Sequence, residues 1–111
     1  WHELMTTDPE RAAAFYAVTL GWRAEETPMP TGRYWMLRRA DGSDVGGLMA
    51  IPDGAPMASG WGVYVAVDDV AATHARALAA GAHETFAVME VPGVGRMSGI
   101  VDPTGAAIAF G

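Results

Sequence analysis

The sequence predicts an α+β fold made of two tandem βαβββ modules, and three observations support this prediction. The chain repeats when Trp1 is set over Trp61, because Gly21 then falls over Gly81. In each copy, apolar residues alternate with other residues before an aspartate. An Ala-rich segment that ends in glycine then follows the aspartate.

The first copy opens with a strand over His2–Thr6, which alternates at period two. Asp8 can accept hydrogen bonds from the free amides of a helix start, and proline suits the first helical position. We therefore expect a helix from there to about Leu20, which ends at Gly21. Its buried stripe is expected to hold Ala12, Phe15, and Ala14 or Val18.

Three strand-like runs follow this helix, separated by turn-forming residues. The expected strands are Trp22–Glu26, Arg33–Arg39 and Val45–Ile51. The expected turns are TPMPTG at Thr27–Gly32 and ADGSD at Ala40–Asp44. We expect a linker at Pro52–Gly60, because this stretch is rich in proline, glycine and small residues. The two modules then cover residues 1–51 and 61–111.

The second copy repeats this order of elements. A strand over Val63–Val67 precedes a helix capped by Asp68 or Asp69, which has Val70, Ala77 and Leu78 on its inner side. Three further strands are expected at Ala82–Val91, Arg96–Val101 and Ala106–Phe110, with turns at VPGVG and DPTG.

With these elements the chain resembles the vicinal oxygen chelate superfamily, which includes glyoxalase I, bleomycin-resistance proteins and extradiol dioxygenases. The features that carry the resemblance are D-P-E-R-A-A-A-F-Y at the first helix, L-G-W at its end, V-D-D-V at the second helix and D-P-T-G before the last strand. The resemblance covers essentially the whole chain. It implies that the two modules form a curved mixed sheet around a cleft, with the helices on the outer face.

Strand alternation separates the neighbours His2 and Glu3, which at first suggest a metal site. Val63, Val65 and Val67 form an apolar set that we expect under the second helix. The repeat then places His2, Leu4 and Thr6 on the helix side of the first strand, and Trp1, Glu3 and Met5 in the cleft. A bulge that shifts the register would return His2 to the cleft. The three histidines, His2, His74 and His83, share no expected face.

The resemblance also implies four cleft positions that carry His, Gln or Glu in metal-binding members of the superfamily. They fall on Trp1, Gly62, Ala109, and Met49 or Gly47. None of these side chains is a good ligand for a hard divalent ion, because methionine offers only a thioether and the others offer nothing. We therefore expect no metal ligand and no cofactor, with a divalent metal as the alternative.

An aromatic and Met-rich cleft face is expected to bind the ligand. Its candidate residues are Trp1, Glu3, Met5, Tyr34, Met36, Met49 and Tyr64. Partial desolvation would raise the pKa of Glu3, which suits a general base or a ligand hydrogen bond. The alternative is that Glu3 pairs with Arg38 or Arg96 and closes the sheet edge.

Composition narrows the class of partner. A net charge of −6 argues against nucleic acid, and no apolar run is long enough to cross a bilayer. The chain has no cysteine and no recognisable signal peptide, so we expect a cytoplasmic protein. Its first residue is Trp1 rather than methionine, which indicates a piece of a longer chain.

Three functions are consistent with this sequence. The leading one is a metal-free glyoxalase-like or bleomycin-resistance-like domain that binds a small, partly apolar or aromatic molecule. The second is a metal-dependent lyase, isomerase or dioxygenase with an atypical site, and the third is a non-catalytic interaction module. Whether the chain is an enzyme stays open. The resemblance implies a homodimer, or a tandem protein with a second such unit.

Overall fold

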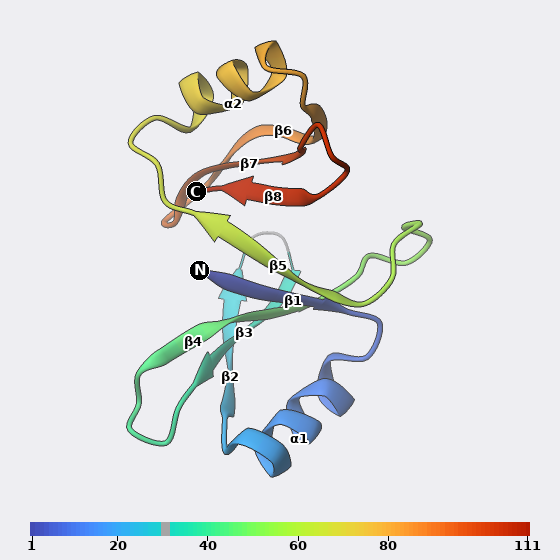
Figure 1. Cartoon of the computed structure of the whole chain (residues 1–111). Helices are drawn as coiled ribbons and strands as arrows, with labels where there is room; N and C mark the ends of the chain where they lie inside the picture. Colours follow the sequence, from blue (N-terminus) through green and yellow to red (C-terminus); the bar gives the residue numbers. More distant parts are fainter. Residues whose placement is uncertain (30–31) are drawn as a thin grey trace. The chain divides into compact units, whose positions relative to one another are not determined.

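The computed structural model describes residues 1–29 and 32–111, and the chain divides into two compact units. Unit 1 covers Trp1–Trp61 and unit 2 covers Gly62–Gly111. Each unit follows the order βαβββ, so the predicted α+β class and the tandem repeat are confirmed (Figure 1). Among the described residues, no helix is long and apolar enough to span a membrane.

Unit 1 contains one helix beside a mixed sheet. Its elements are β1 (His2–Thr6), α1 (Pro9–Leu20), β2 (Arg23–Met29), β3 (Gly32–Arg38) and β4 (Asp44–Ala50). The strand order is β2-β3-β4-β1, in which β1 runs parallel to β4 and the other pairs are antiparallel. The parallel pair follows from the helical crossover and the antiparallel pairs from short turns.

Unit 2 repeats this arrangement. Its elements are β5 (Gly60–Val65), which begins at the boundary of the units, α2 (Val70–Ala79), β6 (His83–Val91), β7 (Gly95–Val101) and β8 (Ala107–Phe110). The strand order is β5-β8-β7-β6, and β5 runs parallel to β8.

Both helices start as the sequence predicts. Asp8 accepts a hydrogen bond from the Arg11 backbone N–H, and α1 ends at Gly21, whose φ of 71° is a left-handed conformation that glycine adopts without strain. Asp69, rather than Asp68, caps α2 by accepting from the Ala72 backbone N–H. The spacing from Asp8 to Asp69 is therefore one residue longer than the spacing from Trp1 to Trp61 or from Gly21 to Gly81. With the spacing of the helix caps, Tyr64 is the counterpart of Glu3.

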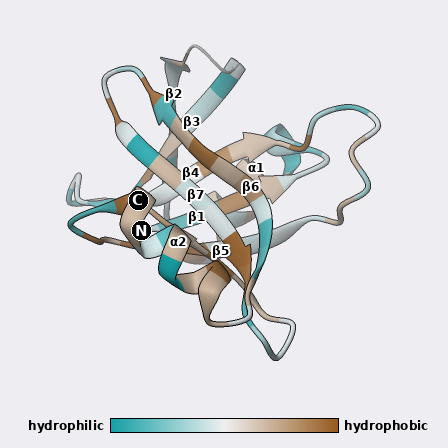
Figure 2. Ribbon diagram, turned by 90° about the horizontal axis from the view of Figure 1, so that it is seen from above, coloured by the Kyte–Doolittle hydropathy of each residue, from teal (hydrophilic) through white to brown (hydrophobic). Residues whose placement is uncertain are grey.

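The core of unit 1 lies between its sheet and α1. Leu4, Trp35, Leu37 and Leu48 are buried there, and burial of each such side chain contributes about 1.5–3 kcal/mol. Figure 2 shows that the strands carry both hydrophilic and hydrophobic segments.

The predicted buried stripe of α1 is wrong in part. Phe15 is 57% exposed and Val18 is 87% exposed, while Ala12 and Tyr16 pack against the core. The helix has no fully buried side chain among its residues. Phe15 borders an open groove together with Leu4 and Ala12, while Tyr16 is the large side chain of α1 that packs against the core.

The predicted burial of Val63 and Val65 on β5 is also wrong. Val63 is 46% exposed and Val65 is 40% exposed, although both were expected beneath the second helix. The reason is that α2 packs mainly over β6, β7 and β8 and leaves β5 uncovered. On α2 itself, Val70 is buried as expected, whereas Leu78 is exposed.

The predicted turn at Thr27–Gly32 is wrong for Thr27–Met29, which belong to β2, and for Gly32, which begins β3. β2 continues through Pro28 to Met29, and Pro28 is tolerated because β2 is the outermost strand of the unit 1 sheet. The rest of that prediction, at Pro30 and Thr31, lies outside the described residues.

Candidate functional site

A chain of hydrogen bonds lies on the face of the unit 1 sheet that α1 does not cover, which we call the helix-free face. The Tyr34 hydroxyl on β3 donates to Glu3 Oε2 on β1 at 2.8 Å. The indole Nε1 of Trp1 donates to the same tyrosine oxygen at 3.3 Å. The chain therefore runs from an N–H donor through a phenol to a carboxylate.

The ring of Tyr34 crosses the strand between its own strand and that of Glu3. On β4, Gly47 pairs with Glu3 on one side and with Met36 on the other. A Cβ atom at Gly47 would overlap the Tyr34 hydroxyl and ring. Glycine is needed here for close approach rather than for an unusual backbone angle.

Three methionines flank this hydrogen-bond chain. The strand registers place Met5, Met49 and Tyr34 in one row across the sheet, and Glu3, Gly47 and Met36 in the next. The methionine side chains are half-buried. Methionine is flexible and polarisable, and it adapts to flat or irregular apolar molecules.

The alternation predicted for β1 is observed. Leu4 and Thr6 are buried on the helix side, whereas Glu3 bonds to Tyr34 on the helix-free face. His2 lies on the helix side, because a Cβ added to its register partner Gly46 would contact the His2 Cβ. Histidine and glutamate therefore lie on opposite faces of the strand.

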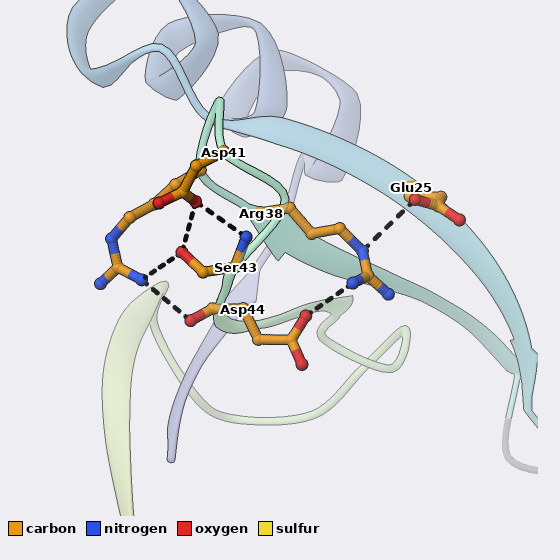
Figure 3. Close-up of polar contacts among 6 residues, drawn as sticks. Glu25, Arg38, Asp41, Ser43 and Asp44 are labelled. Carbon is orange, nitrogen blue, oxygen red and sulfur yellow. Dashed lines mark hydrogen bonds and ion pairs between the residues drawn. The ribbon is translucent and has the colours of Figure 1, made fainter.

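The alternative pairing of Glu3 with Arg38 does not occur. Figure 3 shows the Arg38 guanidinium between two other carboxylates, with Nη1 2.8 Å from Asp44 Oδ1 and Nε 3.3 Å from Glu25 Oε2. The other arginine of that prediction, Arg96, belongs to unit 2.

Tyr64 and Ala109, two further residues singled out in the sequence, pair with each other across β5 and β8 of unit 2. In the same row, Gly99 of β7 pairs with Ala109 and with Phe86 of β6. A Cβ at Gly99 would overlap the Phe86 ring. The helix-free face of unit 2 therefore carries Tyr64, Ala109 and an aromatic ring packed over a glycine.

The donor set does not fit a metal ion. Within residues 1–29 and 32–111, no three His, Cys, Asp or Glu side chains come together in a way that could hold one. The positions at which the resemblance implies metal ligands carry Trp1, Gly47 or Met49 in unit 1, and Gly62 and Ala109 in unit 2. His74 instead lies 2.6 Å from Glu84, between α2 and β6, and His83 is exposed.

Sequence reasoning missed the hydrogen bond between Glu3 and Tyr34 and the role of Gly47. One signal was present, because a glycine inside an apolar strand often marks the close approach of another group. The same signal marks Gly99, and Phe86 beside it was not singled out.

Comparison with known proteins gives a family match over nearly the whole chain. The family described as "Glyoxalase-like domain" matches residues 2–110. CFP32 of Mycobacterium tuberculosis, a protein provisionally named a glyoxylase, is 36% identical over 113 residues, which cover 99% of this chain and 43% of CFP32. The anthracycline biosynthesis protein DnrV of Streptomyces peucetius is 31% identical over 98% of this chain and 44% of DnrV. The chain thus spans less than half the length of these relatives.

Solved structures share the fold at low sequence identity. Methylmalonyl-CoA epimerase from Mycobacterium tuberculosis has a TM-score of 0.68 at 18% identity, with 98% of this chain and 83% of the epimerase covered. A mutant of 4-hydroxymandelate synthase from Streptomyces coelicolor has a TM-score of 0.66 at 19% identity, with all of this chain and 37% of the synthase covered.

Proposed function

We propose, from the premise that the chain belongs to the glyoxalase-like domain family of the vicinal oxygen chelate superfamily, that it binds a small organic molecule without a metal ion. The molecule is small, partly apolar or aromatic, and lies on the helix-free face of unit 1. The observation that carries this proposal is the hydrogen-bond chain of Trp1, Tyr34 and Glu3, flanked by Met5, Met36 and Met49.

The chemistry of this face supports a ligand that is flat and polarisable. Methionine sulfur interacts favourably with aromatic rings, and the carboxylate of Glu3 can fix the orientation of a polar edge. The name of one relative, the anthracycline biosynthesis protein DnrV, connects that relative with anthracycline biosynthesis, which supports recognition of an organic molecule in this family.

A second candidate function is proton transfer at the same face, with Glu3 as the general base. The observation that favours it is the bond from the Tyr34 hydroxyl to Glu3, because the two groups form an acid–base pair within 2.8 Å. The rate of exchange of an acidic C–H in a bound ligand would test this candidate, since Glu3→Gln should abolish any acceleration over solvent.

Methionine methyl NMR tests the site of binding. We expect a ligand found by thermal-shift screening of aromatic metabolites and antibiotics to move the signals of Met5, Met36 and Met49. The exposed Met57 and Met89 lie off this face and serve as internal controls. A ligand that moves only the control signals, or no stabilising ligand at all, would overturn the proposal.

Chelation separates metal-free binding from the metal-dependent alternative. The same titration is repeated after dialysis against EDTA and after addition of Zn²⁺, Mn²⁺ or Fe²⁺. Unchanged affinity supports metal-free binding, because no side chain of the proposed site would have lost a bound ion. Affinity that appears only with a divalent ion, together with a stoichiometric ion in the purified protein, would support the metal-dependent lyase, isomerase or dioxygenase instead.

We also propose that a second glyoxalase-like unit covers the outer side of α1, either from another copy or from the same polypeptide. Phe15, Val18 and Leu20 are exposed on this helix, and the relatives are more than twice as long as this chain. Sedimentation of the chain should show a dimer that the substitutions Phe15→Glu and Val18→Glu dissociate. Leu78→Glu on α2 is the matched control, and a monomer at all concentrations would exclude self-pairing.

A further inference from the structure

We infer that an open groove between β1 and α1 of unit 1, which we call the α1 groove, binds a small carboxylate with an apolar body. The groove has a volume of about 360 Å³, within the range of small-molecule sites, and its lining comes from β1, the start of α1, the turn between them and Ser59. Leu4 and Thr6 line it from the helix side of β1, so it lies on the opposite face of the sheet from the three methionines. The site therefore goes beyond the proposed function.

The apolar part of the lining is the first argument. Leu4, Ala12 and Tyr16 belong to it, and Phe15 borders it with a side chain that is 57% exposed. An apolar ligand in contact with this ring would remove its surface from water, which is favourable. The groove thus offers a surface to the apolar body of a ligand.

A chain of three hydroxyl groups in the groove is the second argument. The Ser59 hydroxyl accepts from the Thr7 backbone N–H at 3.1 Å, and its oxygen lies 3.5 Å from the Thr7 hydroxyl oxygen. Ser59 in turn donates to the Thr6 hydroxyl at 3.4 Å, which also accepts from the Asp8 backbone N–H at 3.2 Å. The chain therefore ends at Thr6.

The Thr6 hydroxyl has a hydrogen that no acceptor receives. A hydroxyl has two lone pairs and one hydrogen, so the two bonds that Thr6 accepts use its acceptor capacity. Its own hydrogen has no acceptor among the described residues, although Thr6 is only 6% exposed. A buried donor without an acceptor costs free energy, and an oxygen of a ligand in the groove would remove this cost.

The charge of Arg11 is the third argument. This residue lines the groove, and its guanidinium has no ion pair and no hydrogen bond within residues 1–29 and 32–111. By contrast, Arg33 and Arg38 of the same unit lie 2.8 Å from carboxylate oxygens. A carboxylate can accept from a guanidinium and from a hydroxyl at once, and such charge-assisted bonds are stronger than neutral ones.

Asp8 is the acidic residue of the lining and opposes this preference in part. Its Oδ1 accepts from the Arg11 backbone N–H at 3.1 Å at the positive end of α1, so the helix end offsets part of its charge. Arg11 is then the charge left to attract a ligand. Removal of the Asp8 charge should strengthen carboxylate binding.

Matched phenyl probes test the inference on the whole chain. Calorimetry with 3-phenylpropionate, 3-phenylpropanamide and 3-phenylpropylamine compares an anion, a neutral acceptor and a cation on one apolar body. We expect the carboxylate to bind at least about tenfold more tightly than the amine, which corresponds to about 1.4 kcal/mol, with the amide between them. Rising NaCl should narrow the difference, because screening weakens the attraction to Arg11. Equal affinities, or no binding, would overturn the inference.

Methyl NMR locates the bound probe. Phenylpropionate should move the signals of Leu4, Thr6 and Ala12, which line the groove, and leave the methionines of the helix-free face in place. If it moves the methionine signals instead, the inference is wrong and the proposed function stands. Val18 does not line the groove, so Val18→Glu should leave binding unchanged. Loss of binding in this variant would place the ligand between two units and would also overturn the inference.

A substitution at Arg11 assigns the charge preference. Arg11→Gln should weaken phenylpropionate at least about fivefold and leave the amide within about twofold, because only the carboxylate gains a charge-assisted bond. Arg23→Gln is the matched control, since it removes the same charge from an exposed arginine of β2 that does not line the groove. If both variants weaken phenylpropionate equally, the net charge of the chain and not the groove sets the affinity, and the inference is wrong.

Substitutions at Thr6 and Asp8 assign the other polar contacts. Thr6→Val keeps the shape of the side chain and should weaken both the carboxylate and the amide, whereas Thr6→Ser keeps the hydroxyl and should retain both. Asp8→Asn keeps a capping side chain and should strengthen the carboxylate at least about twofold without changing the amide. If Thr6→Val does not fold, Thr6→Ser and Asp8→Asn decide, and a carboxylate affinity that neither Asp8→Asn nor Arg11→Gln changes would overturn the inference.

Discussion

On the helix-free face of each unit an aromatic ring packs over a glycine, but the polar groups at the two rings differ. In unit 1 the ring of Tyr34 lies over Gly47, and in unit 2 the ring of Phe86 lies over Gly99. Only the first ring carries a hydroxyl, and that hydroxyl reaches a carboxylate. Because unit 2 makes the same packing without a hydrogen bond of this kind, the pair of Glu3 and Tyr34 is not required by the fold. This difference is the reason that we propose unit 1 as the ligand-binding unit.

The helix sides differ as well. Unit 1 buries an apolar cluster of Leu4, Trp35, Leu37 and Leu48 against α1. In unit 2 the buried residue beneath α2 is the polar His74, whose Nε2 lies 2.6 Å from Oε2 of Glu84, a side chain that is 44% exposed. We therefore expect unit 1 to depend on packing and unit 2 to tolerate changes of polarity.

The largest expected effect concerns the apolar cluster. Leu48→Ala removes a side chain with no exposed surface and should lower the free energy of unfolding by about 2–5 kcal/mol. Leu78→Ala on α2 is the control, because that side chain is exposed and should cost less than about 1 kcal/mol. Urea denaturation measures both. Equal losses would show that the two helix sides are packed alike.

Alanine substitutions at Gly47 and Gly99 test the packing of an aromatic ring over a glycine in each unit. Gly47→Ala should displace Tyr34 and break its bond to Glu3, and Gly99→Ala should displace Phe86, each costing about 1–3 kcal/mol. Only Gly47→Ala should also weaken the binding of the aromatic ligand found by thermal-shift screening, and calorimetry measures this affinity. The double change Gly47→Ala with Tyr34→Ala makes room for the new methyl group and should recover stability without recovering binding. Weaker binding in Gly99→Ala as well would remove the contrast between the units.

The polar pair of unit 2 should contribute little to stability. His74→Leu replaces a buried side chain whose Nδ1 lacks a hydrogen-bond partner among the described residues, and leaves Glu84 free to turn toward solvent. We expect the free energy of unfolding to change by less than about 1 kcal/mol. A loss above about 2 kcal/mol in chemical denaturation would instead identify the pair as a stabilising contact.

The smallest effects concern the aspartate turns that precede the last strand of each unit. The hydroxyl of Ser43 and then its backbone N–H lower the pKa of Asp41. The pKa of Asp102 is lowered by the Thr104 hydroxyl and then by the Ala106 backbone N–H. Because the folded pKa lies below the unfolded one, each turn adds stability above the unfolded pKa. That stability is lost as the pH falls through the folded pKa.

Carbon-detected NMR titration of the two carboxyls measures these shifts. Thr104→Ala should raise the pKa of Asp102 toward its ordinary value and leave that of Asp41 in place, and Ser43→Ala should do the reverse. If one substitution moves both values, the two turns do not act independently.

Much of the fold was predictable because it depends on local patterns. Period-two alternation located β1 and separated His2 from Glu3, and Asp8 with Gly21 located both ends of α1. The side of α1 that is buried was not predictable, since alanines on several stripes make Phe15 and Tyr16 equivalent by period alone. The bond of Glu3 to Tyr34 joins residues on non-adjacent strands, and its geometry depends on a register across β4 that local patterns do not contain.

The aromatic residues of unit 1 have a further practical consequence. Trp61 Nε1 donates to the Tyr16 hydroxyl at 3.1 Å, and Trp22 lies 6.0 Å from Trp61 at 82°. With Trp1 and Trp35, these are the four tryptophans of the chain, and every one belongs to unit 1. Indole emission is therefore an intrinsic optical reporter of unit 1 alone. A mismatch between its melting curve and that of the far-ultraviolet dichroism would reveal whether the two halves of this polypeptide unfold in one step.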